Sequence, residues 1–272
     1  MKVLEVYSKK DLDKLTVKGK KVSKIMDDFF KNYPKSYREN YDKNLETAEI
    51  LKVDEHYTGK HDGEYSDYCN VLLFRMRKYY SIIHELMHMA SCDYVTRRSS
   101  YERCDKGALF EGALIEGMTE HLACIALNQS CEAYHFETFT ASMISNIEGV
   151  LESFFIPSYQ KFINSFPDKR SIISLMYSLE GYFRNCEILL TEETMIDKSL
   201  IETLERSIMG VIDSLIDIQV SRKLGFRENK LYAERFMDLI GEENLNAYLS
   251  DIWEDYYDYA NEQVNRRILR RK

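Results

Sequence analysis

The stretch that decides the fold is His84–His88, HELMH, which lies in a segment, residues 78–92, whose pattern predicts an amphipathic helix. A helix advances about 100° per residue, so His84 and His88 lie about 40° apart on one face and can offer ring nitrogens to one cation. Glu85 is offset by about 100° on the same side, where its carboxylate would hold a water molecule instead of the ion. The apolar residues lie on the opposite arc: Ile82, Ile83, Leu86, Met87 and Ala90.

A second helix with a polar front is predicted for residues 113–128, which begin ALIEGMTEHLACI. Catalytic zinc takes three protein ligands and keeps one position for water or substrate. Glu116 stands 28 positions after His88, far enough for a loop to bring this helix alongside the first. Glu120 follows at i+4 on the same face, opposite an apolar arc of Leu114, Ile115, Met118, Leu122 and Ile125. We expect His84, His88 and Glu116 to bind one Zn2+ ion; the alternative is that Glu116 and Glu120 only form a solvated face.

The two motifs together, HELMH and LIEGMTEHL, resemble the gluzincin superfamily of zinc metallopeptidases. In that superfamily His-Glu-x-x-His is followed on a later helix by Asn-Glu-Gly or a similar triplet, with another acid four residues on. The resemblance covers about residues 70–136, and the size of the chain resembles the compact, minimal gluzincin domains. The chain departs from the pattern at Ile115, where asparagine is common, and it lacks the Gly-x-Met-x-Asn segment of the aminopeptidases.

The resemblance implies a role for each residue of the two motifs. His84, His88 and Glu116 would be the zinc ligands, and Glu85 would be the general base that also carries the proton to the leaving group. Glu120 would be the carboxylate that orients one of the ligand histidines.

The resemblance also implies a tyrosine or histidine that stabilises the negatively charged oxygen of the transition state. We assign this catalytic role to Tyr134, shortly after the second helix. The other candidates are His135, Tyr159, Tyr177 and Tyr182. In the resembled family an edge strand before the zinc helix pairs with the extended substrate, and the segment Cys69–Met76 is in that place here.

The composition predicts a soluble, helix-rich protein. The chain has 272 residues, of which 44% are hydrophobic and 30% charged, with 3 Pro and 11 Gly. Its net charge of −8 argues against nucleic-acid binding, and it has no apolar run of the roughly 20 residues that cross a bilayer. We expect a cytoplasmic protein without a membrane or nucleic-acid partner. The six cysteines, which have no C-x-x-C spacing, are expected to be reduced: Cys69, Cys92, Cys104, Cys124, Cys131 and Cys186.

The predicted fold class is α+β, mainly helical, with a small antiparallel sheet near the N-terminus. The sheet would be a hairpin of Glu49–Tyr57 and Cys69–Met76. We divide the chain into a zinc-binding catalytic lobe, residues 1–130, and a helical lobe, residues 131–272. Helical periodicity marks residues 11–34, 78–92, 113–128, 132–155, 171–190, 195–222 and 229–268.

The function that these patterns predict is a zinc-dependent peptidase that acts on peptides or proteins. One alternative is a non-catalytic helical regulatory or interaction protein on a zinc-peptidase scaffold, with the long C-terminal helices and the basic tail RRILRRK as its working surface. Glu85 favours the enzyme, because a purely structural metal site needs no carboxylate there. A further alternative is a regulatory protease like ImmA and IrrE, although the Glu-Gly-x-x-Glu spacing is more similar to the gluzincins.

Overall fold

The structure is a computed structural model that describes residues 3–54, 63–75, 80–101, 112–131, 133–191, 198–221, 234, 236–238, 241 and 256–269. It is mainly helical with a small sheet near the N-terminus and a helical C-terminal part, as the sequence predicted. Two compact units alternate along the chain. The first comprises Met1–Cys104, Met118–Ala133 and Glu148–Phe162, and the second comprises Asp105–Gly117, Tyr134–Ile147 and Ile163–Lys272. The expected division at residue 130 stays a prediction.

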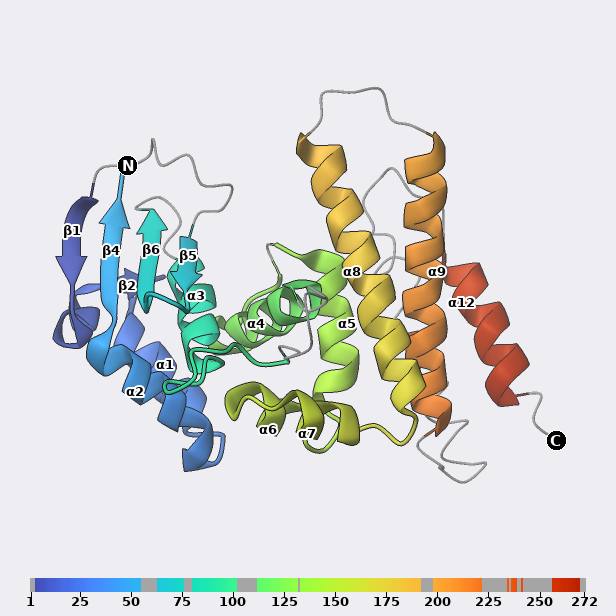
Figure 1. The fold of residues 1–272 in the computed structure, drawn as a ribbon, viewed down its shortest axis with the longest axis horizontal. Coiled ribbons are helices and arrows are strands. Elements are labelled where there is room, and N and C mark those ends of the chain that lie inside the picture. The colour runs from blue at the N-terminus through green and yellow to red at the C-terminus, as the bar shows by residue number, and fades with distance from the viewer. Residues whose placement is uncertain are drawn as a thin grey trace. The chain divides into compact units, whose positions relative to one another are not determined.

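The first unit contains a four-stranded sheet in the order β1-β4-β6-β5 (Figure 1). Its strands are β1 (Val3–Tyr7), β4 (Glu49–Val53), β5 (Gly63–Ser66) and β6 (Val71–Arg75). β4 and β6 pair in parallel, whereas β1 and β5 pair antiparallel with their neighbours. The sheet is therefore mixed and not wholly antiparallel as expected. Leu72 and Phe74 alternate with half-exposed residues along β6, so one face of this strand lies on the core.

The predicted hairpin of Glu49–Tyr57 with Cys69–Met76 is wrong, since the strands in these segments are the parallel neighbours β4 and β6. The hairpin instead joins β5 to β6 through residues 67–70. Asn70 ends this turn with a φ of 53°, and its side-chain oxygen accepts a hydrogen bond from the Tyr65 hydroxyl at 2.8 Å. Asparagine tolerates the left-handed conformation better than most residues. Periodicity shows which segments are extended but not which neighbour each one takes.

The predicted helix over residues 11–34 is divided in the structure. The segment forms a 3-10 helix η1 (Lys9–Lys14), a small hairpin of β2 (Thr16–Val17) and β3 (Lys20–Lys21), and helix α1 (Val22–Phe30). The hairpin turns at Lys18 and Gly19, whose φ angles of 47° and 75° are the positive values that two-residue hairpin turns need. The apolar residues of the predicted helix are all buried: Leu12, Leu15, Val22, Ile25, Met26, Phe29 and Phe30.

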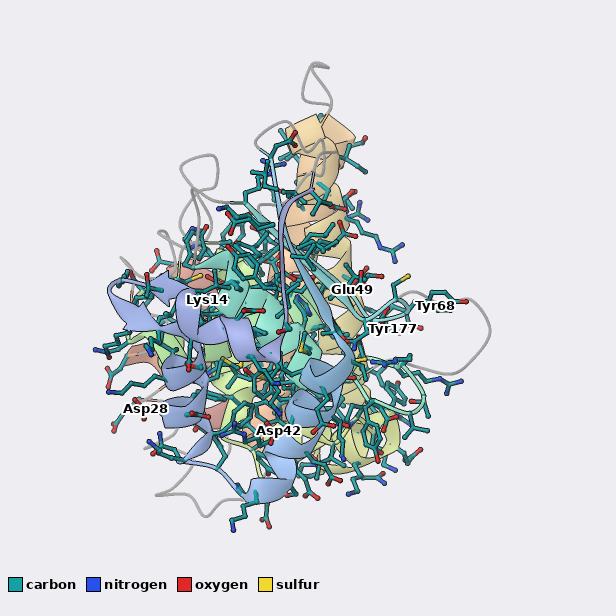
Figure 2. The ribbon with its side chains drawn as sticks, turned by 90° about the vertical axis from the view of Figure 1, so that its left-hand side faces the viewer. Lys14, Asp28, Asp42, Glu49, Tyr68 and Tyr177 are labelled. Carbon is teal, nitrogen blue, oxygen red and sulfur yellow. The ribbon has the colours of Figure 1, made fainter. Side chains whose placement is uncertain are left out.

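Short helices complete the first unit. The 3-10 helix η2 (Lys35–Arg38) leads into α2 (Glu39–Thr47), which packs against α3 (Ser81–Ala90), and α3 packs against β5 and β6 (Figure 1). The Phe155 ring of α6 (Val150–Phe155) anchors the aromatic core, with centroids 5.3–6.2 Å from its neighbours Phe29, Phe30, Tyr33 and Tyr37. Figure 2 shows Asp28, Asp42 and Tyr68 on the outer side of this unit, and Tyr68 is 86% exposed.

The second unit is helical. It contains α5 (His135–Ser145), α8 (Lys169–Thr191), α9 (Lys198–Ser221), α12 (Tyr257–Val264) and the π-helical turn η3 (Asn265–Leu269). α8 and α9 lie side by side along their lengths (Figure 1). Arg267 bonds to Asp213 at 2.9 Å and to Asp217 at 3.1 Å, and Tyr259 donates to Asp213 at 3.0 Å. These contacts fasten the C-terminal segment to α9.

The long helices of the C-terminal half were predicted to within a few residues at α8 and α9. The single helix predicted over residues 132–155 is instead α5 and α6, because the chain turns between them at Gly149, whose φ is 88°. The short helix α7 (Tyr159–Asn164) was not predicted. Most of the helix predicted over residues 229–268 lies outside the described residues, and α12 falls within its range.

Candidate metal centre

Helix α3 carries the His-Glu-x-x-His motif, and nine of its ten residues are buried. Although His84 and Glu85 belong to the polar side of α3, they are only 7% and 6% exposed. His88 is the half-exposed residue of the helix. The end of α3 is fastened by the buried Asn44 of α2, whose amide donates to the carbonyl of Met89 at 2.9 Å and to that of Cys92 at 2.7 Å.

The two histidine rings of α3 turn the same ring nitrogen toward each other. Nε2 of His84 lies 3.1 Å from Nε2 of His88, and the rings meet edge to face with centroids 4.8 Å apart. Two nitrogens bound to one tetrahedral zinc ion at about 2.0–2.1 Å would lie about 3.3 Å apart. The separation in the structure is therefore close to the one that a shared cation requires.

Helix α4 (Gly112–Leu127) supplies the partners of both rings. Glu120, which is 2% exposed, lies with its Oε2 2.9 Å from Nδ1 of His84. A carboxylate only accepts, so this contact places the proton of a neutral His84 on Nδ1 and leaves the lone pair on Nε2. The Thr119 hydroxyl lies 3.5 Å from Nδ1 of His88. Each histidine thus meets α4 through Nδ1 and the other histidine through Nε2.

Glu116 is one turn before Glu120 on α4 and is half-buried. One ligand atom from each of His84, His88 and Glu116 lies within 4.8 Å of the others, so the three residues form a group that could hold a metal ion. This group is the one expected from the spacing of the two motifs. The donors fit a cation of borderline softness, with two imidazole nitrogens and one carboxylate oxygen.

The start of α4 is fixed by residues of the second unit. Glu180 of α8 accepts a hydrogen bond from the Ala113 N–H at 3.1 Å. Gly117, directly after Glu116, faces the backbone of α5 so closely that a Cβ there would overlap the carbonyl group of Glu137. Burial, together with the nearby charge of Glu116, raises the pKa of Glu137 to about 7. The close approach of α4 to α5 therefore explains why the second motif has a glycine directly after Glu116.

Glu85 lies against the end strand of the sheet. A Cβ on Gly63 of β5 would come within 2.9 Å of Cγ and Oε1 of Glu85, so the strand and the carboxylate are in direct contact. The sequence led us to expect Cys69–Met76 as the edge strand, but β6 lies between β4 and β5. Among the described strands, β5 is the edge strand on the side of β6 that is away from β4.

The predicted oxyanion residue Tyr134 directly precedes α5 and takes the left-handed conformation, with φ of 51°. Its ring packs against Phe183, with centroids 6.1 Å apart, and its carbonyl accepts the Thr138 N–H at 2.7 Å. These contacts are structural, and its catalytic role stays a prediction. Of the other candidates, His135 is exposed and Tyr182 packs against Phe136 at 4.7 Å.

Two further differences from the sequence-based expectations concern α4. Thr119 was missed, although it immediately precedes Glu120, because a threonine between motif residues gives no periodic signal of its own. Ile125 was assigned to the buried apolar arc but is 49% exposed, since it lies in the last turn of the helix. His121, directly after Glu120, is half-buried, and burial lowers its pKa.

Comparison of the chain with protein-family models, curated proteins and solved structures finds no match. In the described part of the chain, every helix is too short or too polar to cross a lipid bilayer. The remaining two histidines, His56 and His61, lie outside the described residues.

Proposed function

We propose that this chain is a zinc-dependent peptidase with a metal site of His84, His88 and Glu116. The observation that carries the proposal is the meeting of two Nε2 atoms, 3.1 Å apart, in a group in which one ligand atom from each of His84, His88 and Glu116 lies within 4.8 Å of the others. Two imidazoles and one glutamate are a ligand set of catalytic zinc sites, in which the fourth position stays open. Calcium and magnesium prefer oxygen ligands, so a set with two nitrogens favours zinc.

The residues around the ligands have roles that follow from their chemistry. Glu120 accepts from Nδ1 of His84, which fixes the tautomer that leaves Nε2 as a ligand atom. Glu85 follows His84 directly and is buried, and its carboxylate would take the proton of the attacking water and pass it to the amine that leaves. When bound, zinc would lower the pKa of water to about 7 and polarise the peptide carbonyl.

The sheet suggests how a substrate would be held. β5 lies at one end of the described sheet, and its Gly63 touches Glu85. An extended peptide can add to a sheet edge through backbone hydrogen bonds, with little dependence on its sequence. A peptide that adds to β5 would pass the carboxylate of Glu85, which is why we propose a peptide or protein substrate.

The test of this function is Glu85→Gln. The amide cannot take a proton from water, so we expect a loss of roughly 10²–10⁴-fold in kcat/KM with the zinc content unchanged. The measurements are elemental analysis and turnover of a quenched-fluorescence peptide library. Glu148→Gln, at an exposed residue outside α3, α4 and β5, is the matched control and should keep full activity.

Two results would contradict the proposal. A Glu85→Gln variant as active as the wild type would exclude Glu85 as the base. A zinc-loaded wild type that cleaves no member of the library would favour the non-catalytic regulatory protein instead.

A further inference from the structure

Two thiols lie behind the carboxylate that holds His84. Cys124 is one turn after Glu120 on α4, and its Sγ lies 3.7 Å from Glu120 Oε1, where the thiol donates. The thiol of Cys131 lies against the thiol of Cys124 and donates to the Ala133 carbonyl at 2.7 Å. A continuous series of contacts therefore runs from His84 through Glu120 and Cys124 to Cys131.

The end of α4 explains why the two thiols meet. The helix stops at Leu127, and Asn128 takes the left-handed conformation with φ of 51°. The N–H of Gln129 then reaches back to the carbonyl of Cys124 at 3.1 Å, which is the reversal that commonly ends helices. This reversal returns the chain to the last turn of α4, so Cys131 lies beside Cys124 although seven positions separate them.

The other described cysteines have different surroundings. Cys69 is exposed, Cys92 is buried and donates to the Asp93 carbonyl at 3.7 Å, and Cys186 lies in the second unit beside Tyr182. In the part of the chain that the structure describes, the contact between two thiols is confined to Cys124 and Cys131. Both are half-buried, so a small oxidant can reach them.

We propose that Cys124 and Cys131 form a reversible disulfide that controls how tightly the metal is bound. The disulfide removes the S–H donor from Glu120, and Glu120 then holds Nδ1 of His84 in an altered position. This inference rests on the proposed metal site, while the disulfide itself does not depend on it.

Glutathione disulfide is an oxidant that balances the reaction. The Cys131 thiolate attacks one sulfur of glutathione disulfide, the S–S bond breaks, and one glutathione thiolate leaves and is protonated. Cys124 then loses its proton to solvent and attacks the Cys131 sulfur of the mixed disulfide, which releases the second glutathione. Two protein thiols are oxidised and one glutathione disulfide is reduced to two glutathione molecules.

The surroundings of the pair set which thiol reacts first. Contact with Cys131, burial and the charge of Glu120 raise the pKa of Cys124 far above its usual range. Cys124 therefore keeps its proton, so we assign the attacking thiolate of the thiol–disulfide exchange to Cys131.

The disulfide is tested by mapping. The protein is treated with excess glutathione disulfide, free thiols are alkylated, and peptides are analysed by mass spectrometry. We expect a cross-link between Cys124 and Cys131 that dithiothreitol reverses, that is absent from Cys131→Ser and that is retained in Cys69→Ser. The proposal is overturned if Cys69 becomes glutathionylated, which shows that the oxidant acted, while Cys124 and Cys131 remain alkylated.

The coupling to the metal is tested by zinc affinity in competition with a chromogenic chelator. The oxidised wild type should bind zinc about 10-fold more weakly than the reduced protein, because contacts behind a ligand histidine typically change metal affinity by about 10–100-fold. Oxidised and reduced Cys131→Ser should bind alike. Equal affinities of the two wild-type forms would overturn the coupling, whereas a reduced protein without zinc affinity would instead refute the metal site.

Discussion

Two helix pairs in this chain are joined by opposite means. α3 and α4 meet through polar atoms, with Glu120 Oε2 2.9 Å from His84 Nδ1 and a hydroxyl near the second histidine. α8 and α9 meet through glycine, since a Cβ on Gly210 would lie 2.5 Å from the hydroxyl of Ser178. Gly181 approaches α9 in the same way, with its hypothetical Cβ 3.0 Å from Ser207 Oγ.

The polar contacts between α3 and α4 position a metal ligand, whereas the glycine contacts between α8 and α9 allow close packing. A buried hydrogen bond contributes only about 0.5–1.5 kcal/mol net, but it fixes the position and tautomer of an imidazole. Close approach of two backbones instead lets apolar side chains fill the interface. The buried apolar residues of α8 and α9 include Ile172, Leu175, Leu179, Leu204, Ile208, Val211 and Leu215. Substitutions between α3 and α4 should therefore change metal binding more than stability, and those between α8 and α9 should do the reverse.

The largest effect is expected for His84→Ala. Loss of one of three protein ligands should weaken zinc binding by about 10³-fold or more, while the fold is retained. Chelator competition and circular dichroism measure the two quantities. His135→Ala removes an exposed histidine and should bind zinc as the wild type does. If both variants bind zinc like the wild type, the assignment of His84 as a zinc ligand is wrong.

Glu120→Gln should have the next largest effect. The neutral amide is a weaker acceptor for Nδ1 of His84, so we expect zinc affinity to fall by roughly 10–100-fold. The same competition assay applies, with Glu148→Gln as the control for an exposed glutamate outside α3 and α4. An unchanged affinity would mean that Glu120 does not orient the ligand.

Gly210→Val tests the other helix pair. The added side chain would collide with Ser178, and we expect the free energy of unfolding to fall by about 1–3 kcal/mol. Zinc affinity should not change, which is the reverse of the result for Glu120→Gln. Denaturant unfolding gives the stability, and the double variant with Ser178→Ala should recover part of it. A large loss of zinc affinity in Gly210→Val would contradict the separation of the two interfaces.

The smallest effect is expected for Thr119→Val. The hydroxyl lies 3.5 Å from Nδ1 of His88, which is a long hydrogen bond, so its removal should weaken zinc binding by roughly 3-fold. Thr119→Ser keeps the hydroxyl and should bind zinc as the wild type does. A loss as large as that of Glu120→Gln would show that the two histidines are held equally.

The sequence predicted the two motif helices well because both have a strong helical period. The expected range of 78–92 contains all of α3, and that of 113–128 differs from α4 by one residue at each end. The convergence of His84 and His88 follows from their i, i+4 spacing alone. The spacing could not indicate that Glu120 would form a hydrogen bond with His84 and not with His88.

The remaining differences arise from contacts between distant segments. The closeness of Gly63 to Glu85 and of Gly117 to α5 depends on how elements pack, which no local pattern encodes. The parallel pairing of β4 and β6 likewise depends on β5, which periodicity did not reveal. At Lys18, the positive φ needed for a tight turn interrupts a segment whose apolar spacing looks helical.

The buried Asn44 has a consequence for the order of events in metal binding. Its amide donates to two carbonyls at the end of α3, and its side-chain oxygen accepts from Arg97 at 2.6 Å. The last turn of α3, which carries His88, is thereby kept from fraying, so little conformational entropy is left to lose when an ion arrives. Amide hydrogens there should exchange slowly even after chelation, in contrast to zinc fingers, which unfold without their metal.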